Sequence, residues 1–470
     1  MRISIAFLAA ALALWPGGAR ADGAFPDELQ VFAPADHPSR LVVAANFGLL
    51  ESEDSGKSWY YVCERQAGAS GNIALYQFGP TGTLLGDALI GAPLPPGQSA
   101  LTRSADLGCT WGNASGCFPV GYVWDAAFDP ANAGRVLALS NASDAGGDSS
   151  AVFPSTDDGV TFGCPVYTTP SSLQGIEFCQ SQPGTLYLTG NHLGDAGTAP
   201  FVVEGFDGGA AWSSEIDHPE LAAALATYGT DAGLSPDAGA PLNPILKLAA
   251  VDPNDCRTVY FLLLRQDGRR FIAVTHDGGQ TIQVIFGATP GMPISAFLIG
   301  QDGTAYVGQG CAPGSSSPCP KPGLWTAPPG STTFQQASQI NVQCLAERAG
   351  VLYAGGNNWV DHFALGSSTD KGQSWTPLLL FQSIAGLAAC PDTDIVKTCG
   401  SAWCGETGLV GFFGIQDAGY PCDAGGAGGS GGAGGGSTAS PTGCGCGAAG
   451  DAAGLLGFLG LMTVWRRKRG

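Results

Sequence analysis

SEDSGKSW (Ser52–Trp59) is the first of six short stretches that share one pattern of residues. The other five are SADLGCTW (Ser104–Trp111), STDDGVTF (Ser155–Phe162), GFDGGAAW (Gly205–Trp212), THDGGQTI (Thr275–Ile282) and STDKGQSW (Ser368–Trp375). In every copy an Asp is followed two residues later by Gly and, three residues after that, by a large apolar residue. Because the first four copies begin at residues 52, 104, 155 and 205, the pattern predicts an all-β repeat fold with a period of roughly 50 residues.

The residue types in the pattern are those of a tight turn between two strands. An Asp carboxylate accepts hydrogen bonds from backbone N–H groups just ahead of it, and Gly adopts a positive φ without steric cost. A Ser or Thr hydroxyl at the start adds a further local bond. We assign a structural role in these turns to Asp54, Gly56, Trp59, Asp106, Gly108, Trp111, Asp157, Gly159, Phe162, Asp207, Gly209, Trp212, Asp277, Gly279, Asp370, Gly372 and Trp375.

The repeated stretch resembles the Asp box, or BNR repeat, of sialidases, sortilin-type receptors and photosystem II assembly factors. The resemblance implies a β-propeller in which each box joins the third and fourth strands of a blade. It also implies that the boxes lie away from any catalytic centre. Six copies in near-constant register make this interpretation specific, whereas one D-x-G turn alone is common.

The sequence between the boxes predicts four strands in each blade. In the third blade these are VWDAAFDP, RVLALSN, SAVFPSTD and VTFGCPVY, each of them bounded by turn residues. One further blade fits between the fifth and sixth boxes, with Pro328, Pro329 and Gly330 in place of the box. The count is therefore seven blades, and an eighth is left open.

Four segments outside this pattern carry their own expectations. Asp27–Pro34 is expected to give the inner or outer strand of the first blade. His218–Leu225 is the one plausible helix, and Ala222–Pro244 reads as an extended surface insertion. Ile384–Cys404 is expected to pack beside the first blade, tied by disulfides among Cys390, Cys399 and Cys404.

The two ends of the chain carry targeting signals around a propeller domain at residues 22–424. Residues 1–21 have the charge, apolar run and small-residue site of a signal peptide, with cleavage expected after Ala21. Residues 425–443 form a Gly/Ser-rich linker, and residues 444–470 hold a Gly-Cys pair, an apolar run and an Arg cluster.

The order of parts in residues 444–470 resembles the MYXO-CTERM sorting tag of myxobacteria. This resemblance implies removal of the tag by a sorting protease and anchoring through Cys444 or Cys446. The alternative is a plain membrane tail anchor, since the apolar run is short for a spanning helix. We expect the protein to be exported and anchored at the cell surface or outer membrane through its C-terminal region.

Composition limits the possible partners. The net charge of −19 argues against nucleic acid, which requires a basic face. Fifteen cysteines suit an oxidising compartment, and their close spacings (Cys109/Cys117, Cys164/Cys179, Cys311/Cys319 and Cys399/Cys404) indicate disulfides of undetermined connectivity. Paired C-x-x-C units are absent, so no metal or cofactor is expected, and His276 is expected to face solvent in a turn.

The sequence favours a binding module over an enzyme. A sialidase needs an Arg motif of the type [Phe/Tyr]-Arg-x-Pro, which is missing, and Arg40 is expected to face solvent. Asp125, Glu177 and Glu204 lie on expected strands and are candidates to line a channel, although edge or solvent-facing positions are preferred for them. We therefore assign no catalytic residue and expect an extracellular glycan or protein as ligand. The alternative is a non-sialidase glycoside hydrolase, which would need two carboxylates.

Overall fold

The computed structural model describes residues 28–409 except 68–73, 89–100, 118–121, 145–146, 195–196, 228–243, 266–267, 290–291, 312–322 and 392–393. All described residues belong to the first of two units of the chain, Met1–Cys422. The predicted signal peptide, linker and C-terminal tag, with Ala21, Cys444 and Cys446, lie outside the described residues. Among the described residues, no helix has both the length and the apolar character needed to span a membrane.

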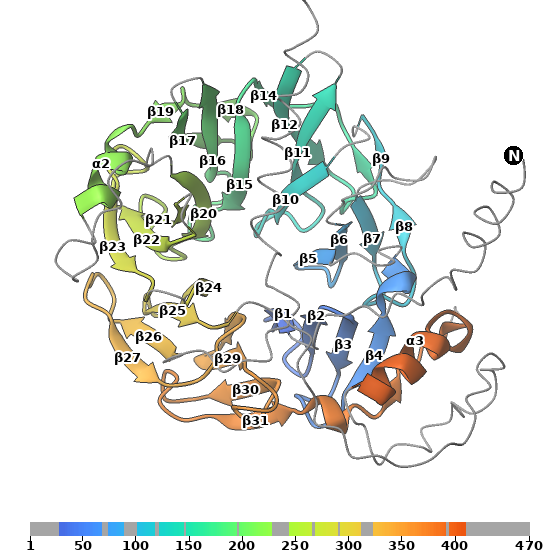
Figure 1. Cartoon of the computed structure of the whole chain (residues 1–470). Helices are drawn as coiled ribbons and strands as arrows, with labels where there is room; N and C mark the ends of the chain where they lie inside the picture. The colour runs from blue at the N-terminus through green and yellow to red at the C-terminus, as the bar shows by residue number, and fades with distance from the viewer. Residues whose placement is uncertain are drawn as a thin grey trace, which may run out of the picture. The chain divides into compact units, whose positions relative to one another are not determined.

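Seven small antiparallel sheets form the seven blades of a β-propeller, which confirms the predicted fold and blade count (Figure 1). The first three blades contain β1 (Glu28–Phe32), β2 (Leu41–Ala45), β3 (Gly48–Ser52) and β4 (Tyr60–Cys63); β5 (Ala74–Phe78), β6 (Leu84–Ala88), β7 (Leu101–Ser104) and β8 (Gly112–Asn113); and β10 (Tyr122–Phe128), β11 (Val136–Asp144), β12 (Gly147–Ser155) and β14 (Tyr167–Thr169). A short parallel pair, β9 (Ser115–Gly116) and β13 (Thr161–Phe162), links the second and third blades.

The remaining four blades repeat the same order of strands. They contain β15 (Ser172–Phe178), β16 (Leu186–Gly194), β17 (Gly197–Phe206), β18 (Ala211–Trp212) and β19 (Ile216–Asp217); β20 (Ile245–Val251), β21 (Val259–Leu264), β22 (Arg270–Thr275) and β23 (Gln283–Gly287); β24 (Ile294–Ile299), β25 (Ala305–Gln309), β26 (Gly323–Ala327) and β27 (Gln335–Ser338); and β28 (Leu345–Arg348), β29 (Val351–Gly355), β30 (Leu365–Ser368) and β31 (Thr376–Leu379). Each Asp-containing stretch follows the third strand of its blade.

The first strands of the blades contact one another in chain order, from β1 through β5, β10, β15, β20 and β24 to β28. Because β28 also contacts β1, the ring is closed, and these seven inner strands surround its centre (Figure 1). The prediction that Asp27–Pro34 gives a strand of the first blade is confirmed, with β1 as the innermost strand.

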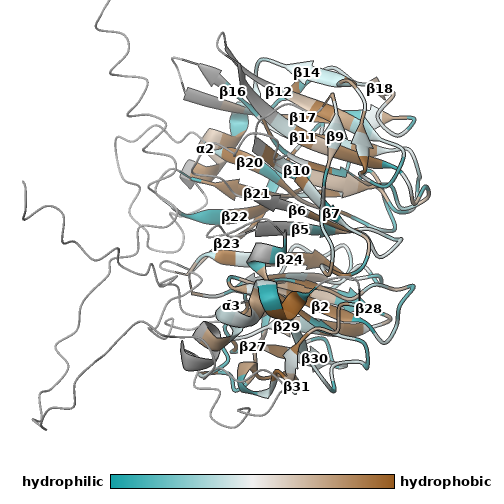
Figure 2. Cartoon of the chain, turned by 90° about the vertical axis from the view of Figure 1, so that its right-hand side faces the viewer, coloured by the Kyte–Doolittle hydropathy of each residue, from teal (hydrophilic) through white to brown (hydrophobic). Residues whose placement is uncertain are grey.

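The core lies between the faces of neighbouring blades. Second and third strands are largely buried, as in β2 and β25, where every residue is buried. Hydrophobic colour accordingly follows the strands, while many connecting loops are hydrophilic (Figure 2). This pattern is typical of propellers, because burial on both faces of a sheet selects continuous β-branched and aromatic runs.

The segment after the last blade is a strap over the first two blades, residues 381–409. It contains a short helix η2 (Phe381–Ser383), β32 (Gly386–Leu387) and α3 (Ile395–Leu409). β32 pairs in parallel with β4 at Tyr60 and Tyr61, and α3 packs against β4 with the Trp403 ring 5.9 Å from that of Tyr61. The predicted position beside the first blade is confirmed.

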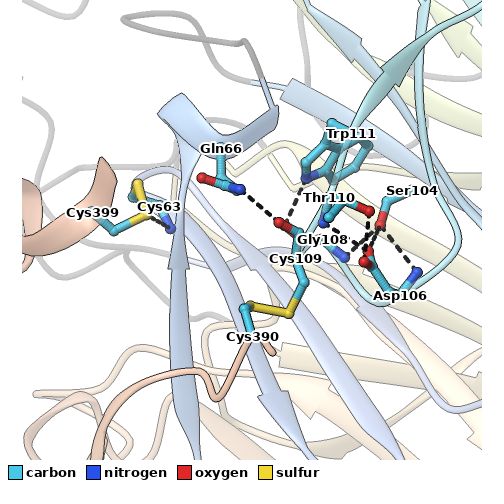
Figure 3. The surroundings of a disulfide bond; sticks show 10 residues. All are labelled: Cys63, Gln66, Ser104, Asp106, Gly108, Cys109, Thr110, Trp111, Cys390 and Cys399. Carbon is cyan, nitrogen blue, oxygen red and sulfur yellow. Dashed lines mark hydrogen bonds between the residues drawn. A yellow bond between two sulfur atoms is a disulfide. The ribbon is translucent and has the colours of Figure 1, made fainter. Parts of the chain in front are cut away.

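The disulfides of this strap differ from the prediction. Cys399 is bonded to Cys63 and Cys390 to Cys109, so the bridges fasten the strap to the first two blades rather than to itself (Figure 3). Two further disulfides, Cys117–Cys164 and Cys179–Cys256, also join neighbouring blades. The interpretation of cysteines close in sequence as partners is therefore wrong for Cys109/Cys117, Cys164/Cys179 and Cys399/Cys404, because the ring brings distant segments together.

The observed helices agree only in part with those predicted from the sequence. The helix predicted at His218–Leu225 is found as α2 (Glu220–Thr227), which also takes the first residues of the expected insertion. The helix α3 was not predicted, since its sequence contains three glycines and lacks a clear apolar stripe. A short helix η1 (Glu64–Ala67) follows β4.

Candidate functional site

Five of the six Asp-containing turns share one network of hydrogen bonds. In the first blade the Ser52 hydroxyl donates to Asp54 Oδ1 at 2.9 Å and accepts from the N–H of Gly56 at 2.9 Å. Ser58 donates its N–H to Asp54 Oδ1 at 2.9 Å and its hydroxyl to Oδ2 at 2.7 Å. The same four contacts recur around Asp106, Asp157, Asp277 and Asp370. The Asp carboxylates of these turns are thus occupied within the turn.

The backbone of these turns requires two consecutive residues with positive φ. In the third blade these are Asp158, with φ of 63°, and Gly159, with φ of 81°. A Cβ at Gly159 would also lie 2.8 Å from the Leu85 side chain of the second blade. The Gly of the pattern therefore satisfies both a left-handed backbone and close packing between blades.

The hydrogen bonds lower the pKa values of the turn carboxyls. Bonds from the Ser58 hydroxyl and N–H hold the pKa of Asp54 at about 2, and bonds from Ser374 do the same for Asp370. For Asp277, desolvation acts upward, but bonds from Thr275 and Thr281 outweigh it and bring the pKa to about 2. These carboxylates stay ionised, which suits acceptors of N–H bonds and does not suit proton donors.

The turn of the fourth blade departs from this network. Gly205 and Ala211 replace the two hydroxyl residues, and among the described residues the Asp207 side chain makes no hydrogen bond. Asp207 itself has a φ of 51°, so three residues in a row are left-handed. The backbone anchor of the turn is kept, because the N–H of Gly208 donates to Gly184 O at 2.8 Å, like that of Asp158 to Gly134 O.

The final Trp of the pattern folds back over its own turn. Trp111 Nε1 donates to Gly108 O at 2.8 Å, next to the Ser104 and Asp106 contacts (Figure 3). In the first blade Trp59 Nε1 donates both to Gly56 O and, at 3.0 Å, to Leu378 O of the seventh blade. This Trp therefore also contributes to closure of the ring.

The second candidate region is the set of inner strands. Each inner strand is an edge strand, whose unpaired backbone groups need partners. The side-chain amide of Gln30 makes two hydrogen bonds to the backbone of Tyr76 in the next blade. It donates to the Tyr76 carbonyl oxygen at 2.9 Å and accepts from the Tyr76 N–H at 2.8 Å. In turn the Gln77 amide donates to Asp125 Oδ1 at 3.1 Å, and Asp125 Oδ2 accepts from the N–H of Ile176 at 3.0 Å. Side chains of one blade thus cap the edge of the next.

Two carboxyl groups on the inner strands, those of Asp125 and Glu177, have raised pKa values. Desolvation raises the pKa of Asp125 to about 6, against the opposing effect of the N–H groups of Ile176 and Ala126. Desolvation likewise raises that of Glu177 to about 8, with the Val251 N–H acting against it and the charge of Asp125 adding to it. Both residues lie on edge strands, which agrees with the edge position preferred from sequence, but neither carboxyl is simply solvent-facing.

The third acid considered from sequence lies elsewhere. Glu204 is on the third strand β17, where its backbone bonds Ser213 and its carboxyl accepts from the Tyr187 hydroxyl at 3.5 Å. Arg40 also differs from expectation, because its Nε donates to Glu53 at 2.7 Å and its side chain is largely covered. His276 is exposed in its turn, as expected.

One aromatic residue accompanies the inner acids. The pairing of β10 with β11 shifts register between Val123 and Asp125, so Trp124 is the extra residue of a β-bulge. Its side chain is 43% exposed, which is unusual for a Trp on an inner strand. The structure thus brings Trp124, Asp125 and Glu177 to neighbouring strands β10 and β15. Among the described residues, no three His, Cys, Asp or Glu side chains are arranged to hold a metal ion.

Comparison with known proteins gives structural similarity alone. No family model matches the chain, and no curated protein matches it. Solved structures similar to it include the GH74 enzyme of Niastella koreensis (14% identity, TM-score 0.36) and the GH74 xyloglucanase of Xanthomonas campestris (16%, 0.37). Each alignment covers 76% of this chain and 46% of the other, so the chain spans about half the length of those enzymes.

A Hadza microbial sialidase, Hz136, is also similar, at 15% identity and a TM-score of 0.38, over 67% of this chain and 70% of that one. Similarity at these values carries no information about the activity of this chain. The assignment as a seven-bladed propeller rests on the strand topology described above.

Proposed function

We propose that this chain is an exported propeller, displayed at the cell surface, that acts as a binding or interaction module for an extracellular glycan or protein. Four disulfides between distant segments support an oxidising destination. The signal peptide and sorting tag predicted from sequence supply the route and the anchor.

One observation favours a binding function over a catalytic one: the carboxylate of Asp125, near the centre of the ring, is already hydrogen-bonded within the protein. Asp125 accepts bonds from the N–H groups of Ile176 and Ala126, at 3.0 and 2.9 Å, besides the Gln77 amide. A carboxylate with three donors is held as a structural acceptor, and breaking these bonds would expose an unpaired strand edge. The five fully bonded turn carboxylates are occupied in the same way.

The test is a glycan array together with capture of extracellular proteins, using the processed protein released from the cell surface. Binding that saturates and survives Asp125→Asn supports the proposal, since that variant keeps the size of the side chain and removes its charge. Intact-mass measurement of the same material tests display: loss of residues 1–21 and of the Arg466–Gly470 end is expected. A complete Arg466–Gly470 end on the surface form would contradict the sorting tag and leave a tail anchor.

A second candidate function is hydrolysis of a glycosidic bond, favoured by one observation. Glu177 keeps its proton near neutral pH while Asp125 is ionised for the most part, and the exposed Trp124 lies beside them on β10. Two carboxyls with separated pKa values can share the roles of general acid and base. A panel of chromogenic glycosides decides between the functions. Hydrolysis lost in Glu177→Gln and kept in Glu204→Gln would favour the enzyme.

A further inference from the structure

A cluster of hydroxyl, imidazole and carboxyl groups lies where the third and fourth blades meet. Ser171 precedes β15, His192 is on β16 and Asp217 is on β19. The Ser171 Oγ lies 2.7 Å from His192 Nδ1, and His192 Nε2 lies 2.9 Å from Asp217 Oδ1. A hydroxyl on one ring nitrogen and a carboxylate on the other is the arrangement that activates a serine nucleophile.

The imidazole is held firmly in this arrangement. The ring of His192 packs against that of Phe201, with centroids 4.6 Å apart. A second carboxylate, Glu215, lies 3.5 Å from Nε2 and is itself fixed by the hydroxyls of Tyr167 and Thr169, at 2.8 and 2.9 Å. The ring is therefore held by an aromatic neighbour and by two carboxylates near Nε2.

The other histidines provide internal comparisons. His276 Nδ1 lies 3.0 Å from the Thr258 hydroxyl, but no carboxylate bonds its other nitrogen in the described structure. His218 Nδ1 lies 2.8 Å from Glu220, and its Nε2 is buried without a partner among the described residues. Of the chain's five histidines, all of them described, His192 alone contacts both a hydroxyl and a carboxylate.

We propose that Ser171 is an activated nucleophile that accepts small acyl groups from neutral carboxylic esters. Ser171 Oγ attacks the ester carbonyl carbon while its proton moves to His192 Nδ1. That proton then leaves with the alcohol as the ester C–O bond breaks. Water next attacks the acyl-serine, gives a proton to Nδ1, and the proton returns to Ser171 Oγ as the carboxylic acid departs. The Nε2–H of His192 donates to the Asp217 carboxylate throughout the reaction, so Asp217 is a positioning residue.

The surroundings set the class of substrate. Ser171 is only 4% exposed, beneath a His192 side chain that is 35% exposed, so a short acyl group such as acetyl fits the approach better than a long one. The carboxylates of Glu215 and Asp217 repel anionic substrates, which disfavours phosphate esters.

The experiment is labelling of the intact protein with a small fluorophosphonate, followed by mass spectrometric location of the adduct. Hydrolysis of p-nitrophenyl acetate is measured in parallel. The adduct is expected on Ser171 and absent in Ser171→Ala. His192→Gln is expected to slow labelling by roughly 10²-fold or more, the usual contribution of a general base. His276→Gln is the matched control and is expected to label at the wild-type rate.

Asp217 is tested by Asp217→Asn and Asp217→Glu, with melting curves for every variant. Asp217→Asn is expected to slow labelling and change its pH profile, and Asp217→Glu to restore part of the rate. Failure of Ser171→Ala to fold would leave the histidine and aspartate variants to decide. An adduct on another residue, or labelling of Ser171 at an unchanged rate in folded His192→Gln, would overturn the proposal.

Discussion

Asp125 and Asp157 belong to the same blade and both accept backbone N–H groups, yet their pKa values move in opposite directions. Asp157 lies in the turn after the third strand, where bonds from Thr161 and Ser155 outweigh desolvation and lower its pKa. Asp125 lies on the inner strand, where desolvation outweighs the bonds from Ile176 and Ala126 and raises its pKa to about 6. The same chemical contact therefore produces a fixed charge at the rim of a blade and a group that titrates near neutrality at the centre.

This difference predicts two opposite dependences of stability on pH. The largest effect is expected on acidification, because several turns lose their ionised carboxylates together. The folded pKa values of Asp54, Asp277 and Asp370 are about 2, below those of unfolded Asp near 3.9. Their stabilisation is complete above about pH 4 and is lost as the pH falls through 2.

Thermal melts between pH 5 and pH 2 check this expectation. The melting temperature should fall steeply below pH 4, and the Asp277→Asn variant should show a shallower fall. A melting temperature that stays constant down to pH 2 would contradict the role given to the turn carboxylates.

The second effect comes from the inner ring and has the opposite sign. Glu177 has a folded pKa of about 8, raised from 4.5, so the folded state holds a proton that the unfolded state has lost. Stability therefore falls as the pH rises from about 4.5 to about 8. Glu177→Gln keeps an acceptor for the Val251 N–H and should remove this loss.

Urea unfolding at pH 5 and pH 9 measures that change. The variant is expected to be more stable than the wild type at pH 9 by about 1 kcal/mol or more, since one pKa unit corresponds to about 1.4 kcal/mol. Asp125→Asn should act on the lower part of the same range, around pH 6. If the free energy of unfolding changes equally between pH 5 and pH 9 in the wild type and in Glu177→Gln, Glu177 has an ordinary pKa in the folded protein.

The third effect is the loss of one turn. Asp157→Ala removes the acceptor of three bonds, from the Ser155 hydroxyl and from the N–H and hydroxyl of Thr161. Loss of such a cap typically costs about 1 kcal/mol. The melting temperature should drop while ligand binding stays nearly unchanged. A variant that kept its melting temperature but lost binding would assign this Asp to a ligand site instead.

The features that could be predicted from the sequence are those set by residues close together along the chain. Strand alternation, turn residues and the 50-residue spacing are local, so the blades, the presence of a first-blade strand in Asp27–Pro34 and the altered turn at Pro328–Gly330 could be inferred. The Cys63–Cys399 bridge spans 336 residues and depends on ring closure, which leaves no local signal. The helix α3 contains residues that disfavour helices, and its packing on β4 overrides that propensity.

The candidate sites were predicted less well for the same reason. Asp125 and Glu177 could be named as acids on strands, but their capping of the next blade depends on how the inner strands meet. Ser171, His192 and Asp217 come from three separate strands or loops and form no motif. Their only sequence signal is a polar residue at the end of an apolar strand, which is too common to be specific.

The smallest effect is expected in the fourth blade, where the Asp and Gly of the pattern persist without the hydroxyl residues. Because the Asp207 side chain makes no hydrogen bond among the described residues, Asp207→Asn should change the free energy of unfolding by less than about 0.5 kcal/mol. Asn is chosen over Ala because it also tolerates the left-handed φ of 51°.

The reverse change sharpens the same comparison. Ala211→Thr restores one hydroxyl at the position that Thr161 holds in the third blade, and it should stabilise the protein only if Asp207 can reach the new donor. Gly205→Ser is a poor choice for the other hydroxyl, because its Cβ would lie 2.7 Å from the Trp212 ring. A loss of about 1 kcal/mol in Asp207→Asn, measured by urea unfolding beside Asp157→Asn, would show that the Asp stabilises the turn without its hydroxyl partners.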